Sequence, residues 1–247
     1  MRKLIISAFM FTLLLLSFSS ARRYLVDVEE ISYYKTTVNM TSPTIAHITK
    51  KIVIRNIIDR DIVPGYAYLY LSKIPATFYG KPSNERKAVN VMNLRARTDT
   101  GIKLETSLKS NTTTTIIRYG IWLPLAPNET ITVYLSYDIE GIADRGILFY
   151  NVVAPLESSS IPIRKYDIEV IPPKGYFVSY APDGKKVPMS SEKAYLWSDK
   201  SAIMQYSRIP MVPLPVPGSI VFWVALIMII FIWGFSDKLK KVMVGRQ

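Results

Sequence analysis

The side chains that could do chemistry are few, and they form no recognisable catalytic set. His47 is the only histidine, and it lies in an alternating strand pattern between Thr44 and Ile54. A Ser-His-Asp arrangement could in principle use it, but no nucleophile-elbow motif accompanies it. A lone histidine in a chain without cysteine cannot form an ordinary structural zinc site. We therefore interpret His47 as a residue on a strand surface rather than a catalytic one.

The notable carboxylates are those of Asp59, Asp61, Asp138, Glu140 and Asp144. Asp138 and Glu140 share one strand face, and such pairs can bind calcium or do acid–base work. The dense spacing of a calcium loop is missing, so a solvated face or turn is the favoured interpretation. Neither glycine-rich phosphate-binding pattern occurs. The sequence therefore predicts a non-enzyme with no catalytic residue, no metal site and no cofactor.

Tyrosines form the best candidate for an interaction surface. Tyr66, Tyr68 and Tyr70 alternate with Ala67 and Leu69, so they share one face of a strand. A tyrosine offers contact area together with a hydroxyl, which suits sugars or a protein partner. The same stripe could instead be a core or cross-strand stack.

The elements that must position these residues are short strands. Many runs alternate with period two, turn signals such as Pro64-Gly65 separate them, and no convincing amphipathic helix precedes residue 217. This pattern predicts an all-β ectodomain, an antiparallel β-sandwich. We expect strands at Tyr24–Tyr34, Thr44–Ile58, Tyr66–Ser72, Val89–Asn93, Ile102–Leu108, Thr114–Gly120, Thr130–Ile139, Gly146–Val152, Ile163–Ile171, Tyr176–Tyr180, Ala194–Ser198 and Ala202–Tyr206.

The ectodomain is either one β-domain or two β-units. The expected seam lies at residues 155–162, where Glu157-Ser158-Ser159-Ser160 is polar. It would separate a sandwich of residues 22–156 from a membrane-proximal β-unit of residues 157–208.

The N-terminal end has the three parts of an export signal. Arg2 and Lys3 precede an apolar run, and small residues end at Ala21. We expect residues 1–21 to be a signal peptide. Arg22-Arg23 directly after the expected cleavage position is unfavourable for export, so an uncleaved anchor stays open as the alternative.

The C-terminal end has the composition of a single membrane crossing. No charge occurs from Ile209 to Ser236, and Trp223 and Trp233 lie towards the two ends of the apolar run. We expect a transmembrane helix at residues 218–236. Proline recurs through residues 209–217, which predicts a stiff linker that could also touch a partner or the lipid headgroups.

Lysines after the apolar run set the expected orientation. Lys238, Lys240 and Lys241 lie in the tail of residues 237–247, which the positive-inside rule places in the cytoplasm. The expected protein is therefore a single-pass protein of the cell membrane, with its N-terminal domain extracytoplasmic and the lipid bilayer as one partner.

Charge and composition exclude one class of partner. The formal net charge is +12, but lysine and arginine are scattered among acids and form no basic stripe with interleaved aromatics, so we expect no nucleic acid. Cysteine is absent, so the domain must be held by its core. Low cysteine, glutamine and histidine with abundant isoleucine, lysine and tyrosine is typical of heat-adapted organisms and would fit an archaeal origin.

Three segments match the acceptor pattern for N-glycosylation. They begin at Asn39, Asn111 and Asn128, all in expected loops or strand edges on the exported side. Purely structural roles in turns are the alternative for Asn111 and Asn128. The pattern predicts a glycoprotein.

Parts of the ectodomain resemble the lumenal part of ribophorin I, a non-catalytic subunit of the oligosaccharyltransferase complex. The resemblance lies in residues 121–133, an LP-turn-strand passage, and in Leu148-Phe149-Tyr150 followed by residues 163–172. A C-terminal single-pass helix with a basic tail completes it. The resemblance implies an accessory subunit beside a membrane glycosyltransferase, with no catalytic residue carried over.

These observations predict a non-catalytic accessory or scaffold subunit of a membrane complex, with integral membrane protein partners and glycans as further contacts. The alternative is a cell-surface adhesion, pilus or surface-layer-associated binding protein. A surface hydrolase is disfavoured because no catalytic constellation can be assembled.

Overall fold

Seven strands form the largest sheet of the molecule. The structure is a computed structural model, and it describes residues 27–75, 85–146, 149–154, 156–188, 193–198, 202–210 and 223–234. The strand order in this first sheet is β13-β14-β11-β1-β2-β7-β4. Its members are β1 (Glu29–Met40), β2 (Ile45–Asn56), β4 (Asn90–Thr98), β7 (Thr130–Glu140), β11 (Tyr166–Ile171), β13 (Lys185–Pro188) and β14 (Lys193–Ser198).

Two four-stranded sheets complete the fold. The second sheet has the order β10-β3-β6-β5 and the third has the order β12-β15-β9-β8. The second sheet contains β3 (Gly65–Ser72), β5 (Thr106–Ser110), β6 (Thr115–Ile121) and β10 (Leu156–Ser159). The third sheet contains β8 (Ala143–Arg145), β9 (Tyr150–Val153), β12 (Phe177–Tyr180) and β15 (Ile203–Ser207).

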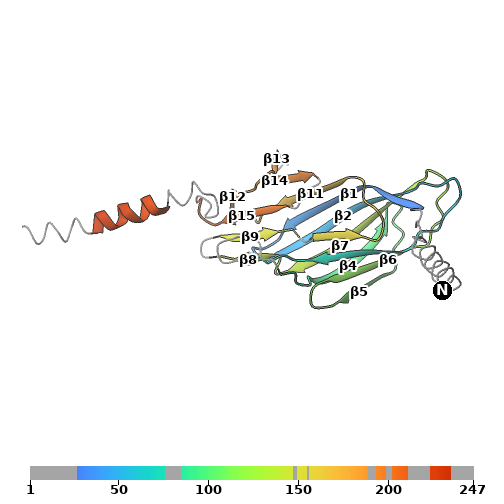
Figure 1. Ribbon diagram of the computed structural model, residues 1–247, viewed down its shortest axis with the longest axis horizontal. Coiled ribbons are helices and arrows are strands. Elements are labelled where there is room, and N and C mark those ends of the chain that lie inside the picture. Colours follow the sequence, from blue (N-terminus) through green and yellow to red (C-terminus); the bar gives the residue numbers. More distant parts are fainter. Residues whose placement is uncertain are drawn as a thin grey trace, which may run out of the picture.

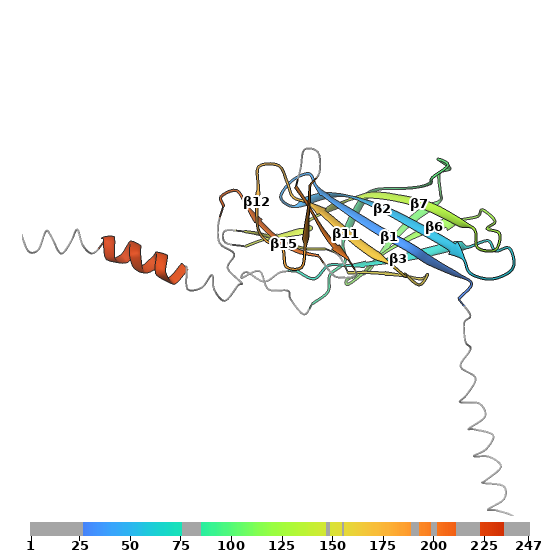
Figure 2. The ribbon, with the colours of Figure 1, turned by 90° about the horizontal axis from the view of Figure 1, so that it is seen from above.

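The three sheets share one hydrophobic core. Ile52 and Val133 of the first sheet, Leu69 and Ile117 of the second and Met204 of the third are all buried in the same cluster. Figures 1 and 2 show the third sheet at the end of the sandwich opposite the start of β1. The all-β expectation and the β-sandwich are therefore confirmed.

One strand pair departs from the expected antiparallel arrangement. β11 pairs with β1 in parallel, with Tyr34 opposite Tyr166, whereas the other pairs between the named strands are antiparallel. The chain reaches β11 from β10 in the second sheet, so it crosses the sandwich and arrives beside β1 in the same direction. A crossover of this kind is what parallel neighbours require.

A strand inside the expected seam at residues 155–162 and a strand after it both pair with strands that precede it. β10 joins the second sheet beside β3, and β11 joins the first sheet beside β1. Buried residues from both sides, such as Val38 and Val170, belong to the one core. The described part of the chain after residue 156 thus packs as part of the sandwich.

The described part of the C-terminal region contains a short helix at residues 223–234. Among the described residues, no helix is both long enough and apolar enough to cross a bilayer. The expected signal peptide (residues 1–21), most of the proline-rich linker and the tail of residues 237–247 lie outside the described residues.

A candidate binding surface on the second sheet

The outward face of β3 carries a row of tyrosines. Tyr66, Tyr68 and Tyr70 point outward, while Ala67 and Leu69 between them are buried. Tyr66 and Tyr70 are each 36% exposed. The alternation follows from the two-residue period of a strand whose other face lies on the core. The structure thus brings the three tyrosines of the sequence analysis together on a surface.

Trp122 extends this row beyond the end of β6. Its side chain is 56% exposed, and its ring makes an edge contact with Tyr66 at 4.9 Å between centroids. Gly120, which pairs with Tyr66 across the sheet, lies under the indole. A Cβ on Gly120 would lie 2.8 Å from Nε1 of Trp122, so only glycine leaves room for the ring. Trp122 was not predicted to lie on this surface, and the signal in the sequence is the glycine two residues before it.

Two charged side chains hold Tyr66 in place. Its hydroxyl donates a hydrogen bond of 2.9 Å to Oε2 of Glu105, and the guanidinium of Arg118 lies 4.3 Å from its ring centroid. The hydrogen bond to Glu105 raises the pKa of Tyr66 above its usual value, so the hydroxyl remains a donor. An Nη2 of Arg118 also donates to Glu105 at 3.4 Å. We call Trp122, Tyr66, Arg118 and Glu105 the aromatic platform.

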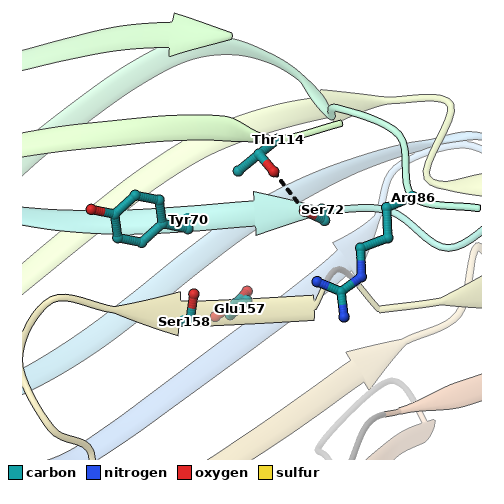
Figure 3. A pocket seen from close by; sticks show the side chains of 6 residues that line it. All are labelled: Tyr70, Ser72, Arg86, Thr114, Glu157 and Ser158. Atoms are coloured by element: carbon teal, nitrogen blue, oxygen red, sulfur yellow. Dashed lines mark hydrogen bonds between the residues drawn. The ribbon is translucent and has the colours of Figure 1, made fainter. Parts of the chain in front are cut away.

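A hollow of about 480 Å³ lies at the other end of β3. Figure 3 shows the guanidinium of Arg86 reaching over the end of β3 towards β10. The lining of the hollow contains the hydroxyls of Tyr70, Ser72, Thr114 and Ser158, and the Ser72 and Thr114 hydroxyls are 3.2 Å apart. Among the described residues, no carboxylate lies within ion-pair distance of Arg86. The hollow is therefore rich in hydroxyls, and its lining carries the guanidinium of Arg86 and the carboxylate of Glu157.

Glu157 of β10, which also lines the hollow, forms an ion pair with Lys50 of β2. The side chain of Lys50 is completely buried, and that of Glu157 is 3% exposed. The ammonium of Lys50 also donates to the hydroxyl of Thr36 at 3.0 Å. This pair links the second sheet to the first across the core, because β10 and β2 belong to different sheets.

Tyrosines surround the ion pair. The Tyr34 hydroxyl donates to Oε2 of Glu157 at 2.7 Å, and the ammonium of Lys50 lies 5.2 Å from the ring centroid of Tyr34 and 5.7 Å from that of Tyr137. Burial raises the pKa of Tyr34 well above its usual value, and the negative charge of Glu157 raises it further. The hydroxyl therefore stays protonated and can donate to the carboxylate.

A buried lysine can act as a nucleophile, so its accessibility decides its role. Burial lowers the pKa of Lys50, while the carboxylate of Glu157 acts in the opposite direction. The side chain has no exposed surface, and its donors are directed at Glu157 and Thr36. A substrate cannot reach the amine in this arrangement, and the geometry gives Lys50 a structural contact rather than a catalytic one.

The structure places His47 on the outward face of the first sheet. Its Nδ1 lies 2.7 Å from Oδ1 of Asp138, whose Oδ2 accepts a hydrogen bond of 2.7 Å from the amide of Asn93. The hydrogen bond from Asn93, followed by that from His47, lowers the pKa of Asp138. Within the described ranges no hydroxyl bonds to the other ring nitrogen, so the nucleophile of a triad has no counterpart there.

The remaining carboxylates singled out in the sequence do not converge. Glu140 is exposed on the same face as Asp138, Asp144 forms an ion pair with Lys73 at 2.6 Å, and Asp59 and Asp61 lie in an exposed loop. No group of three or more potential metal ligands exists among the described residues.

The three acceptor asparagines are all exposed. Asn39 lies near the end of β1. The side-chain oxygen of Asn111 accepts hydrogen bonds from the backbone N–H groups of Thr113 and Thr114, which stabilises a turn. Asn128 has a positive φ of 63° and accepts a hydrogen bond from Arg55. Asn111 and Asn128 therefore have structural roles in turns, and their exposure leaves them open to modification.

Comparison with known proteins gives one relative in sequence. No model of a protein family matches the chain. An uncharacterized protein of Methanocaldococcus jannaschii is 28% identical over 139 residues, which cover 56% of this chain and 98% of that protein.

Solved structures with a similar fold include three crystal structures of the M1 zinc metallopeptidase from Deinococcus radiodurans. They share 10% sequence identity with this chain at TM-scores of 0.39–0.41, and each match covers 72% of this chain. The chain spans 42% of the metallopeptidase. A likeness at this level supports no functional assignment.

Proposed function

We propose that the chain is a non-catalytic, single-pass membrane protein that acts as an accessory or scaffold subunit of a membrane complex, with the second sheet as its ligand-binding surface. The observation that carries the proposal is the aromatic platform. Trp122 is 56% exposed although its ring packs against Tyr66 and Gly120. An exposed indole that is held in one position loses little conformational freedom when a ligand binds.

The composition of the platform supports binding rather than catalysis. Tryptophan, tyrosine and arginine dominate the residues that carry binding energy at interfaces. Tyr66 contacts both Trp122 and Arg118. The buried pair of Lys50 with Glu157 beside the hollow offers its amine no exposed surface. The described residues of this surface are thus equipped to hold a ligand, and no catalytic set is found among them.

The membrane part of the proposal comes from the sequence. The uncharged run of residues 218–236 would anchor the domain, the basic tail of residues 237–247 would lie in the cytoplasm, and residues 1–21 would direct export. The apolar proline-rich residues 209–217 would contact integral membrane partners close to the bilayer. A ribophorin-like subunit of an oligosaccharyltransferase is the most specific form of this proposal.

Copurification tests the accessory role. The full chain carrying an affinity tag is extracted from its native membranes in mild detergent, and the complex is identified by mass spectrometry. We expect defined integral membrane proteins to be recovered in stoichiometric amounts. A control chain, in which residues 209–236 are replaced by an unrelated transmembrane segment, should lose them. Recovery of the tagged chain without integral membrane partners would contradict the accessory role.

A cell-surface adhesion, pilus or surface-layer-associated protein is the second candidate. It is favoured by the place of the platform on a sheet face of the ectodomain, where binding needs no partner in the membrane. Recovery without membrane partners, together with labelling of the intact cell by an antibody against the domain, would support this candidate.

A further inference from the structure

We propose that the aromatic platform and the hollow beside Arg86 form one continuous site for an acidic oligosaccharide. The inference rests on the proposed function, because it takes the second sheet as the binding surface and names the class of ligand that this surface would hold.

Trp122 offers the stacking surface for a sugar ring. Pyranose rings have faces of C–H groups that pack on the electron-rich face of an indole, and the same rings carry hydroxyls at their edges. The Trp122 indole packs over Gly120 on one side and is 56% exposed. Tyr66 meets it at 80° and prevents it from tilting.

The rim of the platform supplies partners for hydroxyl groups. Glu105 is 52% exposed and Arg118 is 37% exposed at their side chains. The Tyr66 hydroxyl donates to one carboxylate oxygen of Glu105, and Arg118 makes a weak contact with the other. Lone pairs of Glu105 and N–H groups of Arg118 are therefore available to a ligand. A carboxylate and a guanidinium side by side can accept from one sugar hydroxyl and donate to its neighbour.

The outward face of β3 connects the platform to the hollow through hydroxyl-bearing side chains. Tyr66, Tyr68, Tyr70 and Ser72 follow one another at alternate positions. The distance along the strand from Tyr66 to Ser72 is ~20 Å at the usual rise of a β-strand. A site of this length suits a short chain of sugars rather than a single one.

Arg86 selects an anionic group at the far end. Glu157 is already paired with Lys50, so the charge of Arg86 is the one that a ligand in the hollow would meet. Arginine binds carboxylate and phosphate groups through paired N–H donors. The hydroxyls of Tyr70, Thr114 and Ser158 line the same hollow. The ligand that fits has stacking sugar rings at Trp122 and a uronate carboxylate or a sugar phosphate at Arg86.

Oligosaccharide binding to the full chain tests the inference. The protein is purified in a detergent without a sugar headgroup, and calorimetry compares a neutral, a uronate-bearing and a phosphorylated oligosaccharide of about four units. We expect the acidic ligands to bind about tenfold more tightly than the neutral one, with the tighter of the two identifying the anion. Absence of binding by all three ligands would overturn the inference.

Variants locate the two ends of the site. Trp122→Ala should weaken binding of every ligand about tenfold, and Arg86→Gln should abolish the preference for acidic ligands while leaving the neutral one unchanged. Phe177→Ala and Arg97→Gln serve as controls, because these residues are exposed on other strands. Binding that is unaffected by Trp122→Ala would overturn the inference.

The folded state of each variant is checked by its thermal transition. If Trp122→Ala unfolds, Trp122→Phe and Glu105→Gln test the same platform with smaller changes, and each should weaken binding severalfold. Copurification is scored separately. Sugar binding without recovery of membrane partners would contradict only the accessory role. Recovery of membrane partners without sugar binding would contradict only the sugar site.

Discussion

Replacing Lys50 by methionine should destabilise the protein strongly, although methionine is the more apolar residue. Lys50 has no exposed surface, and its ammonium contacts Glu157 and Thr36. Lys50→Met leaves the Glu157 carboxylate buried at 3% exposure without its counter-ion. Glu157→Leu leaves the buried ammonium of Lys50 without its counter-ion.

The expected cost follows from this burial. Removing one member of a buried, hydrogen-bonded ion pair costs about 3–5 kcal/mol. For a domain of this size, 1 kcal/mol corresponds to about 2–4 °C in the unfolding temperature, so each single variant should lose about 6–20 °C. The double variant Lys50→Met with Glu157→Leu removes both charges and should regain most of this loss.

A residual loss should remain in the double variant because Tyr34 also depends on Glu157. The Tyr34 hydroxyl donates to Oε2 of Glu157 at 2.7 Å, and a buried hydroxyl without a partner costs about 1–3 kcal/mol. Adding Tyr34→Phe to the double variant should therefore raise its stability again. This third step distinguishes the loss of a hydrogen bond from poor packing.

Denaturant unfolding of the full chain in detergent, followed by near-ultraviolet circular dichroism, gives the free energy of unfolding of each variant. Lys51→Met is the matched control, because Lys51 is the next residue of β2 and faces solvent. It should change the free energy of unfolding by no more than about 0.5 kcal/mol. The reasoning is refuted if Lys50→Met costs no more than Lys51→Met. It is equally refuted if the two single losses add in the double variant.

Three further predictions concern other parts of the sandwich. Burial raises the pKa of Glu29 from 4.5 to about 7, and its Oε2 has no hydrogen-bond partner among the described residues. Between pH 4.5 and pH 7 the folded protein therefore binds more protons than the unfolded chain. Stability should therefore fall as pH rises from 4.5 to 7, and Glu29→Gln should raise the unfolding temperature at pH 8 but leave it nearly unchanged at pH 4. Gly184→Ala should cost about 1–3 kcal/mol in denaturant unfolding, since a Cβ there would lie 2.6 Å from a ring carbon of the buried Trp197. Gly101→Ala is the contrasting variant, because nothing lies near a new Cβ there and any cost comes from its positive φ, which Gly184 does not have. Intact mass of the protein from its native source should drop by one glycan for each exposed acceptor replaced by glutamine, and an unchanged mass would show that the site is unoccupied. The acceptors are Asn39, Asn111 and Asn128.

Two central strands with one buried face could be placed closely from the sequence, whereas β1, expected at Tyr24–Tyr34, lies at Glu29–Met40. The range expected for β2, Thr44–Ile58, differs from the observed Ile45–Asn56 by one or two residues at each end, and Thr130–Ile139 differs from β7 by one. Both strands alternate because one face lies on the core. The short strands β8, β10 and β13 were not predicted, whereas β12, which also has four residues, lies within the expected Tyr176–Tyr180.

The ion pair between Lys50 and Glu157 was harder to predict, although the position of Lys50 in its strand already indicates a buried charge. Lys50 occupies the inward position of β2 between Ile48 and Ile52, where an alternating pattern calls for an apolar residue. Its partner Glu157 lies 107 residues further along, in a segment that the composition indicates to be polar and flexible. Pairing over such a separation depends on the topology, which local patterns do not contain.

β10 connects the buried ion pair with the proposed sugar site. It is a four-residue edge strand, with backbone pairing to β3 alone. Glu157 turns inward to Lys50, and Ser158, the next residue, turns outward into the hollow. An edge strand this short has few hydrogen bonds to hold its position, so the inward ion pair fixes the wall of the hollow from behind. The buried ion pair therefore helps to position the second sheet's binding surface, because Glu157 both pairs with Lys50 and lines the hollow.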